Sequence, residues 1–135
     1  MQVPPSPVPN RILLVDDEIS VLTTLKMALT AFSYVVDTAS NAEEALLLFN
    51  PAVHDLVITD NSMPGMSGLE LAHAIKLRSA TTPVVMHTGR LPDERSCLDL
   101  VIQKPGNLFA MGEAIGKLVA KRRPDKAARQ SEPGV

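Results

Sequence analysis

Groups that could carry out chemistry stand directly after four short apolar runs of the sequence. The runs and the residues that follow them are 12–15 with Asp16, Asp17 and Glu18, 56–59 with Asp60, 84–87 with Thr88, and 100–103 with Lys104. Taken singly, each group has an ordinary explanation, because aspartate is common in turns and helix caps and lysine is usually solvated. The repetition at four run ends favours one shared site of acids, a hydroxyl and an amine.

Such a set of groups suits phosphoryl chemistry. Converging carboxylates repel one another, and a hard divalent cation with oxygen ligands, Mg²⁺ being the most available, relieves that repulsion. Metal, ammonium and hydroxyl groups can then neutralise the oxygens of a transferring phosphoryl group while a carboxylate attacks it. The residue types therefore predict the formation of an aspartyl phosphate.

The elements that must position these groups follow an alternating pattern. Short apolar runs rich in β-branched residues alternate with segments of helical period, which is typical of a parallel sheet flanked by helices. The runs lie at 12–15, 34–37, 56–59, 84–87 and 100–103. They lack polar alternation, which fits strands buried on both faces, and ligands of such sheets bind beyond the carboxyl ends of the strands.

Four apolar stripes at helical spacing predict the helices. They are Leu22, Leu25, Leu29 and Phe32; Ala42, Ala45, Leu46 and Phe49; Leu69, Ala72 and Ile75; and Leu108, Met111, Ile115 and Leu118. We interpret these stripes as core-facing sides of amphipathic helices. Ser40 followed by Glu43 has the spacing of a capping box and predicts the start of the second helix.

The sequence resembles the receiver domain of bacterial two-component response regulators. The motifs that carry the resemblance are ILLVDDE, VITDNSMPGMSGLEL, VVMHTGR and VIQKPG, and the match runs from about Arg11 to Lys121. The resemblance implies an α/β fold of the flavodoxin-like (CheY-like) type. That fold is a three-layer, doubly wound, five-stranded parallel sheet with strand order 2-1-3-4-5.

The resemblance also implies a role for each residue at the run ends. Asp60 would be the phosphoacceptor, Thr88 would hydrogen-bond the phosphoryl group, and Lys104 would pair with it. Asp16, Asp17, Asp60 and the backbone carbonyl of Ser62 would hold Mg²⁺ as the cofactor. The cis peptide bond of the family maps to Lys104-Pro105, against a background of only about 5% cis among X-Pro bonds.

Two departures from the family stand out. The family usually has a tyrosine or phenylalanine three residues before the lysine, and this chain has Val101 there. Only 16 positions (104 minus 88) separate Thr88 from Lys104, fewer than a full fourth helix and fifth strand need. Gly89 and Pro92 also disfavour a helix start. We therefore expect a fourth helix that is shortened or absent.

Length and composition predict a stand-alone single domain of 135 residues. We expect a flexible Pro-rich arm at 1–10, the receiver domain at 11–122 and a flexible basic tail at 123–135. Residues 1–116 hold 7 Lys and Arg against 13 Asp and Glu, whereas residues 117–135 hold 6 against 2. An acidic body with few aromatic residues argues against a nucleic-acid surface on the body, so only the basic tail could contact nucleic acid, and we favour a solvated tail.

The remaining signals point to a protein without membrane, secretory or transition-metal features. No leader and no long apolar run is present, so we expect a cytoplasmic protein that does not enter a membrane. His54, His73 and His87 are scattered over different segments, and we interpret them as structural or surface residues. Cys97 is interpreted as a small packing residue.

These features favour a phosphoacceptor that takes a phosphoryl group from a sensor histidine kinase or a histidine phosphotransfer protein and signals by protein contact. It would not be an enzyme beyond its own phosphorylation and dephosphorylation. Val101 and the short interval leave open a receiver-fold interaction module that acts without phosphate. A third reading is an Mg²⁺-dependent phosphatase like haloacid dehalogenases, but Ser62 stands where those enzymes carry a second aspartate.

Overall fold

The computed structural model describes the backbone of residues 10–131 and the side chains of residues 10–121. Residues 1–9 and 132–135, which hold most of the predicted arm and the end of the predicted tail, lie outside the described residues. The elements in chain order are β1 (Arg11–Val15), α1 (Ile19–Ala31), β2 (Val35–Ala39), α2 (Ala42–Leu48), β3 (Leu56–Thr59), α3 (Gly68–Arg78), β4 (Val84–Thr88), β5 (Leu100–Gln103) and α4 (Leu108–Ser131).

The five strands form one parallel sheet in the order β2-β1-β3-β4-β5. This is the predicted flavodoxin-like topology, and the prediction is confirmed. The three central strands carry the buried runs, because helices cover both faces of a doubly wound sheet. β1 lies beside β3 with Val15 paired to Thr59, so the residues that follow these two strands begin next to each other.

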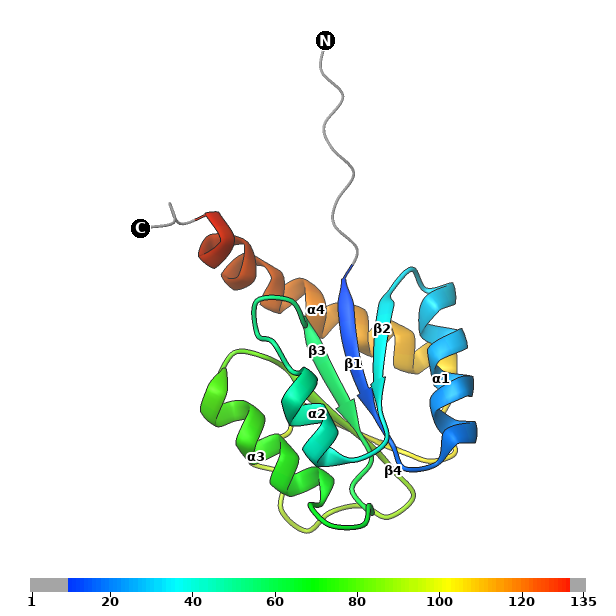
Figure 1. The fold of residues 1–135 in the computed structure, drawn as a ribbon. Helices are drawn as coiled ribbons and strands as arrows, with labels where there is room; N and C mark the ends of the chain where they lie inside the picture. The colour runs from blue at the N-terminus through cyan, green and yellow to red at the C-terminus, as the bar shows by residue number, and fades with distance from the viewer. Residues whose placement is uncertain (1–9, 132–135) are drawn as a thin grey trace.

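Alternation along the strands divides the core into two layers. Leu13 and Val15 of β1 point into a cluster with α2 and α3, whereas Ile12 and Leu14 point into a cluster with α1 and α4. Figure 1 shows the sheet between these two pairs of helices. Each buried side chain of this size contributes about 1.5–3 kcal/mol relative to its exposed state, so the register of β1 is fixed from both sides.

The cap of α2 differs from the sequence prediction. Asn41, not Ser40, is the N-cap, and its Oδ1 accepts a hydrogen bond from the amide of Glu44 at 2.7 Å. The prediction of a Ser40–Glu43 box was therefore wrong by one residue. The helix begins at Ala42 because that start turns the fully buried Ala42 and Ala45 toward the core. Ser40 instead donates from Oγ to the Glu44 carboxylate at 3.2 Å.

His54 has the structural role that the sequence suggested. Its buried ring accepts from the amide of Asn50 at Nδ1, so Nε2 carries the hydrogen that bonds to Asp37 at 2.8 Å. Asp37 also receives the guanidinium of Arg11 at 2.8 Å. Burial alone would raise the pKa of Asp37, but the hydrogen bonds and charges of Arg11 and His54 outweigh burial and hold this pKa below its usual range.

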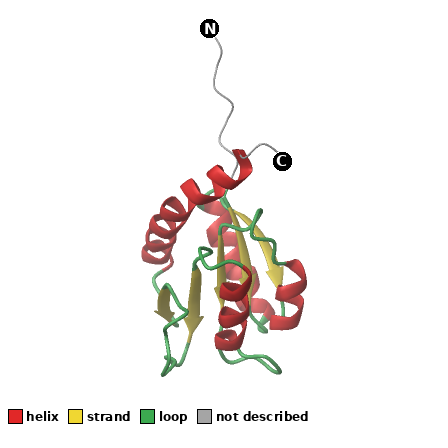
Figure 2. Cartoon of the chain, turned by 90° about the vertical axis from the view of Figure 1, so that its left-hand side faces the viewer, coloured by secondary structure: helices red, strands yellow, loops and turns green. Residues whose placement is uncertain are grey.

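The connection between β4 and β5 contains no helix. Residues 89–99 form a loop with a single turn at 96–97, which agrees with the prediction that the usual fourth helix is shortened or absent (Figure 2). Cys97 and Leu98 pack against the core cluster on the side of α2 and α3. A few apolar contacts thus take the place of the helix and leave β5 paired to β4.

The last helix extends further than the sequence suggested. The sequence analysis expects a flexible tail at 123–135, a stretch that contains Pro124 and Pro133. The backbone of α4 instead stays helical to Ser131, through a stretch rich in the helix formers lysine, alanine and arginine. The flexibility of residues 123–135 stays a prediction.

One glycine is required where the chain leaves β3. A Cβ atom on Gly68 would lie 1.9 Å from the carbonyl oxygen of Asp60. The amide of Gly68 donates to the carbonyl of Asn61 at 3.0 Å, and the amide of Leu69 donates to Asn61 Oδ1 at 3.0 Å. The start of α3 is therefore closed tightly onto the residues that follow β3.

We predict that Gly68→Ala lowers the free energy of unfolding by about 3 kcal/mol, because the methyl group overlaps backbone that cannot move away. Gly89→Ala is the matched control, since a Cβ there meets no heavy atom within 4 Å. It should change stability by less than about 1 kcal/mol. Urea unfolding followed by circular dichroism measures both, and equal effects of the two variants would contradict the packing described.

Candidate functional site

Three carboxylates converge at the carboxyl edge of the sheet. Asp16 and Asp17 follow β1, Asp60 follows β3, and one ligand oxygen of each lies within 4.8 Å of the others. The backbone brings them together, because the amide of Asp60 donates to the carbonyl of Val15 at 3.0 Å and continues the strand pairing. Asp16 and Asp60 are buried, whereas Asp17 is exposed.

Local hydrogen bonds orient the two buried carboxylates. Asp16 Oδ1 accepts from the amide of Glu18 at 2.9 Å, and Asp60 Oδ1 accepts from the amide of Asn61 at 2.7 Å. In both residues the other oxygen, Oδ2, faces Lys104. Each carboxylate thus has one oxygen fixed by the backbone and one oxygen directed into the site.

Lys104 provides the positive charge of the cluster. Its Nζ lies 3.0 Å from Asp16 Oδ2 and 3.4 Å from Asp60 Oδ2. Burial alone would lower the pKa of Lys104, but the hydrogen bond and charge of Asp16, followed by those of Asp60, outweigh burial and raise this pKa. Lys104 therefore stays an ammonium ion at neutral pH and cancels one of the three negative charges.

The charge that remains fits a hard divalent cation. Three carboxylates and one ammonium leave two negative charges (3 minus 1) at this edge. All donors in the cluster are oxygens, which is the ligand type that Mg²⁺ prefers. Asp17 is exposed, so water can reach the cluster and complete the coordination shell that Mg²⁺ usually keeps.

Thr88 lies at the end of the neighbouring strand. Its side chain is buried, and Oγ1 accepts from the amide of Arg90 at 3.4 Å. Its carbonyl accepts from the amide of Lys104 at 2.8 Å, so the pairing of β4 with β5 carries Lys104 into the site. The Lys104-Pro105 peptide bond is cis, as predicted.

The structure therefore brings four of the six predicted site residues into one cluster, namely Asp16, Asp17, Asp60 and Lys104. Thr88 ends the strand beside them. Ser62 lies exposed in the loop after Asp60, and its carbonyl as a metal ligand stays a prediction. The sequence analysis did not identify the backbone amide of Glu18 as the group that orients Asp16. Almost any residue type can donate a hydrogen bond from its backbone amide, so the sequence does not reveal such a bond.

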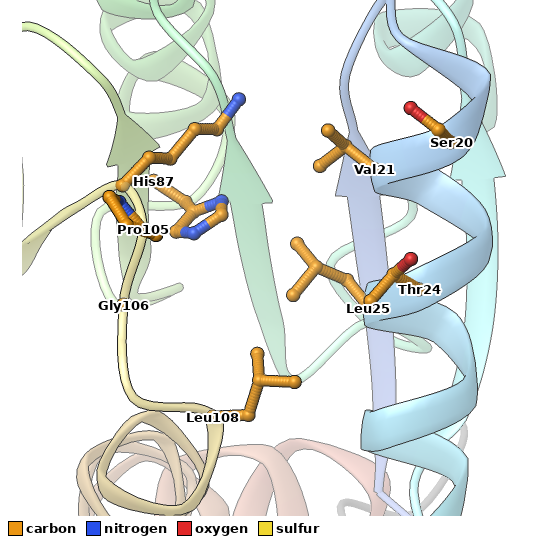
Figure 3. Close-up of a pocket in the computed structure, with 9 residues that line it drawn as sticks. Ser20, Val21, Thr24, Leu25, His87, Pro105, Gly106 and Leu108 are labelled. Carbon is orange, nitrogen blue, oxygen red and sulfur yellow. The ribbon is translucent and has the colours of Figure 1, made fainter.

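A cavity of about 350 Å³ opens next to Lys104 on the α1 side of the sheet. Figure 3 shows the ring of His87 between Leu25 of α1 and Pro105 of the loop after β5. His87 is 6% exposed, and its Nδ1 is buried without a hydrogen-bond partner among the described residues. Burial, followed by the charge of Lys104, lowers the pKa of His87 against the opposing effect of Asp16 and Asp60.

Comparison with known proteins identifies the class to which this fold and site belong. The family model described as the response regulator receiver domain matches residues 12–104. The chain therefore belongs to the response regulator receiver domain family. It has the five-stranded CheY-like fold of that family, without a helix between β4 and β5 in the described residues.

Individual relatives agree with this assignment. The chain is 38% identical over 60% of its length to the transcriptional regulatory protein ResD of Bacillus subtilis, covering 33% of that protein. It is 35% identical over 90% of its length to the probable transcriptional regulator ycf27 of Guillardia theta, covering 49% of it. The chain thus spans between a third and a half of these curated relatives.

A solved structure links the fold to a bound metal complex. The response regulator TrrA of Thermotoga maritima, solved in complex with Mg(2+)-BeF, is 36% identical and superposes with a TM-score of 0.76. The match covers 81% of this chain and 98% of that one. A solved relative of this chain thus binds an Mg(2+)-BeF complex. No helix within the described residues is long and apolar enough to cross a membrane.

We predict that His87→Leu raises the free energy of unfolding by about 1 kcal/mol at neutral pH, because it removes a buried polar atom without a partner. The gain should grow as the pH falls below about 6.5, the usual pKa of histidine. The folded protein binds the proton of His87 less readily than the unfolded chain does, so wild type loses stability in this range and the leucine variant does not.

Urea unfolding at neutral and mildly acidic pH without divalent cations measures this effect. His73→Leu is the control, since the side chain of His73 is exposed and its replacement should give no gain. If His87→Leu were less stable than wild type, the prediction would be contradicted. The imidazole would then make a hydrogen bond that stabilises the fold by more than its burial destabilises it.

Proposed function

We propose that Asp60 is the phosphoacceptor of a two-component phosphorelay. The observation that carries the proposal is the position of its carboxylate, which lies in one cluster with Asp16, Asp17 and the ammonium of Lys104. The donor is a phosphohistidine of a sensor histidine kinase or a histidine phosphotransfer protein. Membership of the receiver family supports this class of donor.

The reaction follows from the charges at the site. A carboxylate oxygen of Asp60 attacks phosphorus, the phosphorus–nitrogen bond of the donor breaks, and the donor histidine leaves with the bonding electron pair and takes up a proton. Asp16, Asp17, Asp60 and the carbonyl of Ser62 would hold Mg²⁺, which when bound would supply positive charge that favours attack by an anion. Asp60 emerges as an acyl phosphate.

Two side chains of the chain stabilise the transferred group. The Lys104 ammonium, which already faces Asp60 Oδ2, pairs with a phosphoryl oxygen. The hydroxyl of Thr88 donates a hydrogen bond to another. Both groups stabilise negative charge on the phosphoryl oxygens in the transition state. Such electrostatic stabilisation is usually the largest single contribution to catalysis.

The signal then passes by protein contact, and the chain turns over no substrate other than its own phosphoryl group. We propose residues 11–122 as the receiver domain, with a basic tail at 123–135 whose first part continues α4, and the cytoplasm as its location. The acidic body supports protein partners over nucleic acid.

A second candidate function is a receiver-fold module that binds partners without phosphate. Val101 replaces the aromatic residue usual in the family, and residues 89–99 have no helix. Both features affect the face that commonly passes the signal on. Phosphate transfer to Asp60 discriminates the two functions, because the module would not need it.

We predict that acetyl phosphate with Mg²⁺ phosphorylates the wild-type chain once and that Asp60→Asn abolishes this, since an amide cannot form the acyl phosphate. Intact-mass spectrometry measures the adduct. Asp93→Asn is the matched control, because Asp93 is an exposed carboxylate of the loop and should leave phosphorylation unchanged. No adduct on wild type, or an adduct retained in Asp60→Asn, would overturn the proposal.

A further inference from the structure

A second group of side chains that could ligate a metal joins α3 to the β4–β5 loop. His73 comes from α3, while Glu94 and Cys97 come from the loop, and one ligand atom of each lies within 4.8 Å of the others. His73 Nε2 is 3.2 Å from Glu94 Oε2. The group is separate from the aspartate cluster, with which it shares no residue.

The local structure explains why these residues meet. The loop has a turn at residues 96–97, and the ligand atoms of Glu94 and Cys97 lie within 4.8 Å of each other across it. Ligands three positions apart across a turn are the spacing that structural zinc sites use for pairs of cysteines. Cys97 also packs against the core cluster beside α3, so the sulfur is held near the helix that carries His73.

The donor set differs from that of the aspartate cluster in its chemistry. An imidazole nitrogen, a carboxylate oxygen and a sulfur are the three ligand types that Zn²⁺ takes in proteins, whereas Mg²⁺ avoids sulfur. Tetrahedral zinc with ordinary bond lengths sets its ligand atoms about 3.4 to 3.6 Å apart. The His73–Glu94 pair, at 3.2 Å, is close to that spacing already.

We propose that His73, Glu94 and Cys97 form a three-ligand Zn²⁺ site, completed by water, that joins the β4–β5 loop to α3. The sulfur of Cys97 lies within 4.8 Å of the other two ligand atoms. A side-chain rotation that brings it closer to them by about 1 Å reaches the tetrahedral spacing. His73 and Glu94 are half exposed, so a metal ion and its water have access from solvent.

The metal has to displace the proton of the Cys97 thiol. Burial, followed by the negative charge of Glu94, raises the pKa of this thiol, with Lys76 and Asp99 as the other charged neighbours. The sulfur therefore binds as a thiolate only as its proton passes to solvent, and binding weakens as the pH falls. Lys76 does not compete for Glu94, because its Nζ lies 2.7 Å from Asp99 Oδ2.

Zinc would add an anchor to a loop whose C-terminal end is already held by the packing of Cys97 and Leu98 and by the hydrogen bonds of Asp99. Residues 89–99 have no helix, and the loop begins at Gly89, directly after Thr88. A metal that binds His73 together with Glu94 and Cys97 links this loop to α3 across more than twenty residues of chain. We therefore expect Zn²⁺ to slow amide hydrogen exchange across the loop while leaving the phosphoacceptor chemistry of Asp60 intact.

Titration of the full chain with Co²⁺, in excess Mg²⁺ to occupy the aspartate cluster, tests the site. We expect one equivalent of Co²⁺ with the charge-transfer absorption of a cobalt–thiolate bond, displaced by one equivalent of Zn²⁺. Cys97→Ser should abolish that absorption, and Cys97→Ser or His73→Ala should weaken Zn²⁺ binding by at least about tenfold. Glu113→Gln, which changes an exposed carboxylate of α4, is the control and should bind as wild type does.

Three results would overturn the proposal. They are cobalt binding without thiolate absorption, zinc affinity unchanged in Cys97→Ser and His73→Ala, and thiolate absorption that appears only as the chain dimerises. Circular dichroism confirms that the variants fold. Because Asp60→Asn should keep the zinc site, failure of the phosphoacceptor assignment and failure of the zinc assignment are separate outcomes.

Discussion

The repulsion among three carboxylates at one edge of the sheet is the constraint on which the rest of the site depends. Asp16 and Asp60 follow neighbouring strands and are buried, so they cannot separate without breaking the pairing of β1 with β3. Lys104 and two backbone amides compensate part of the negative charge. What remains makes the site a strong attractor for a divalent cation, and a cation of that kind is what phosphoryl transfer needs.

Lys104 keeps its position in the site although no helix connects β4 and β5. The lysine reaches the aspartates because β5 pairs with β4 and because its amide bonds to the carbonyl of Thr88. That pairing survives although residues 89–99 form only a loop, since Cys97 and Leu98 pack on the core and Asp99 bonds to Lys76 and the amide of Val84. The placement of Lys104 beside Asp16 and Asp60 is thus kept, while residues 89–99 form no helix over β4 and β5.

Much of the fold and of the aspartate cluster could be predicted from the sequence. The features that could not be predicted depend on burial and on contacts between distant segments. Buried strands lack polar alternation and end in chemically distinct residues, so the parallel sheet and its acidic edge were predictable from the residues, whereas the strand order followed from the family resemblance. The cap of α2 was missed because Ser40 and Asn41 are both good caps and only the burial of Ala42 decides between them. The grouping of His73 with Cys97 and the cavity at His87 arise from contacts between distant segments, which residue spacing does not encode.

Thermal unfolding with and without Mg²⁺, for wild type and Asp17→Asn, tests the central claim about repulsion most directly. Asp17 is exposed, so its replacement perturbs charge and not packing. The account predicts that Mg²⁺ stabilises wild type, and that Asp17→Asn is more stable than wild type without Mg²⁺ and gains far less from it. A wild-type protein that is indifferent to Mg²⁺, or a variant that gains as much as wild type, would contradict it.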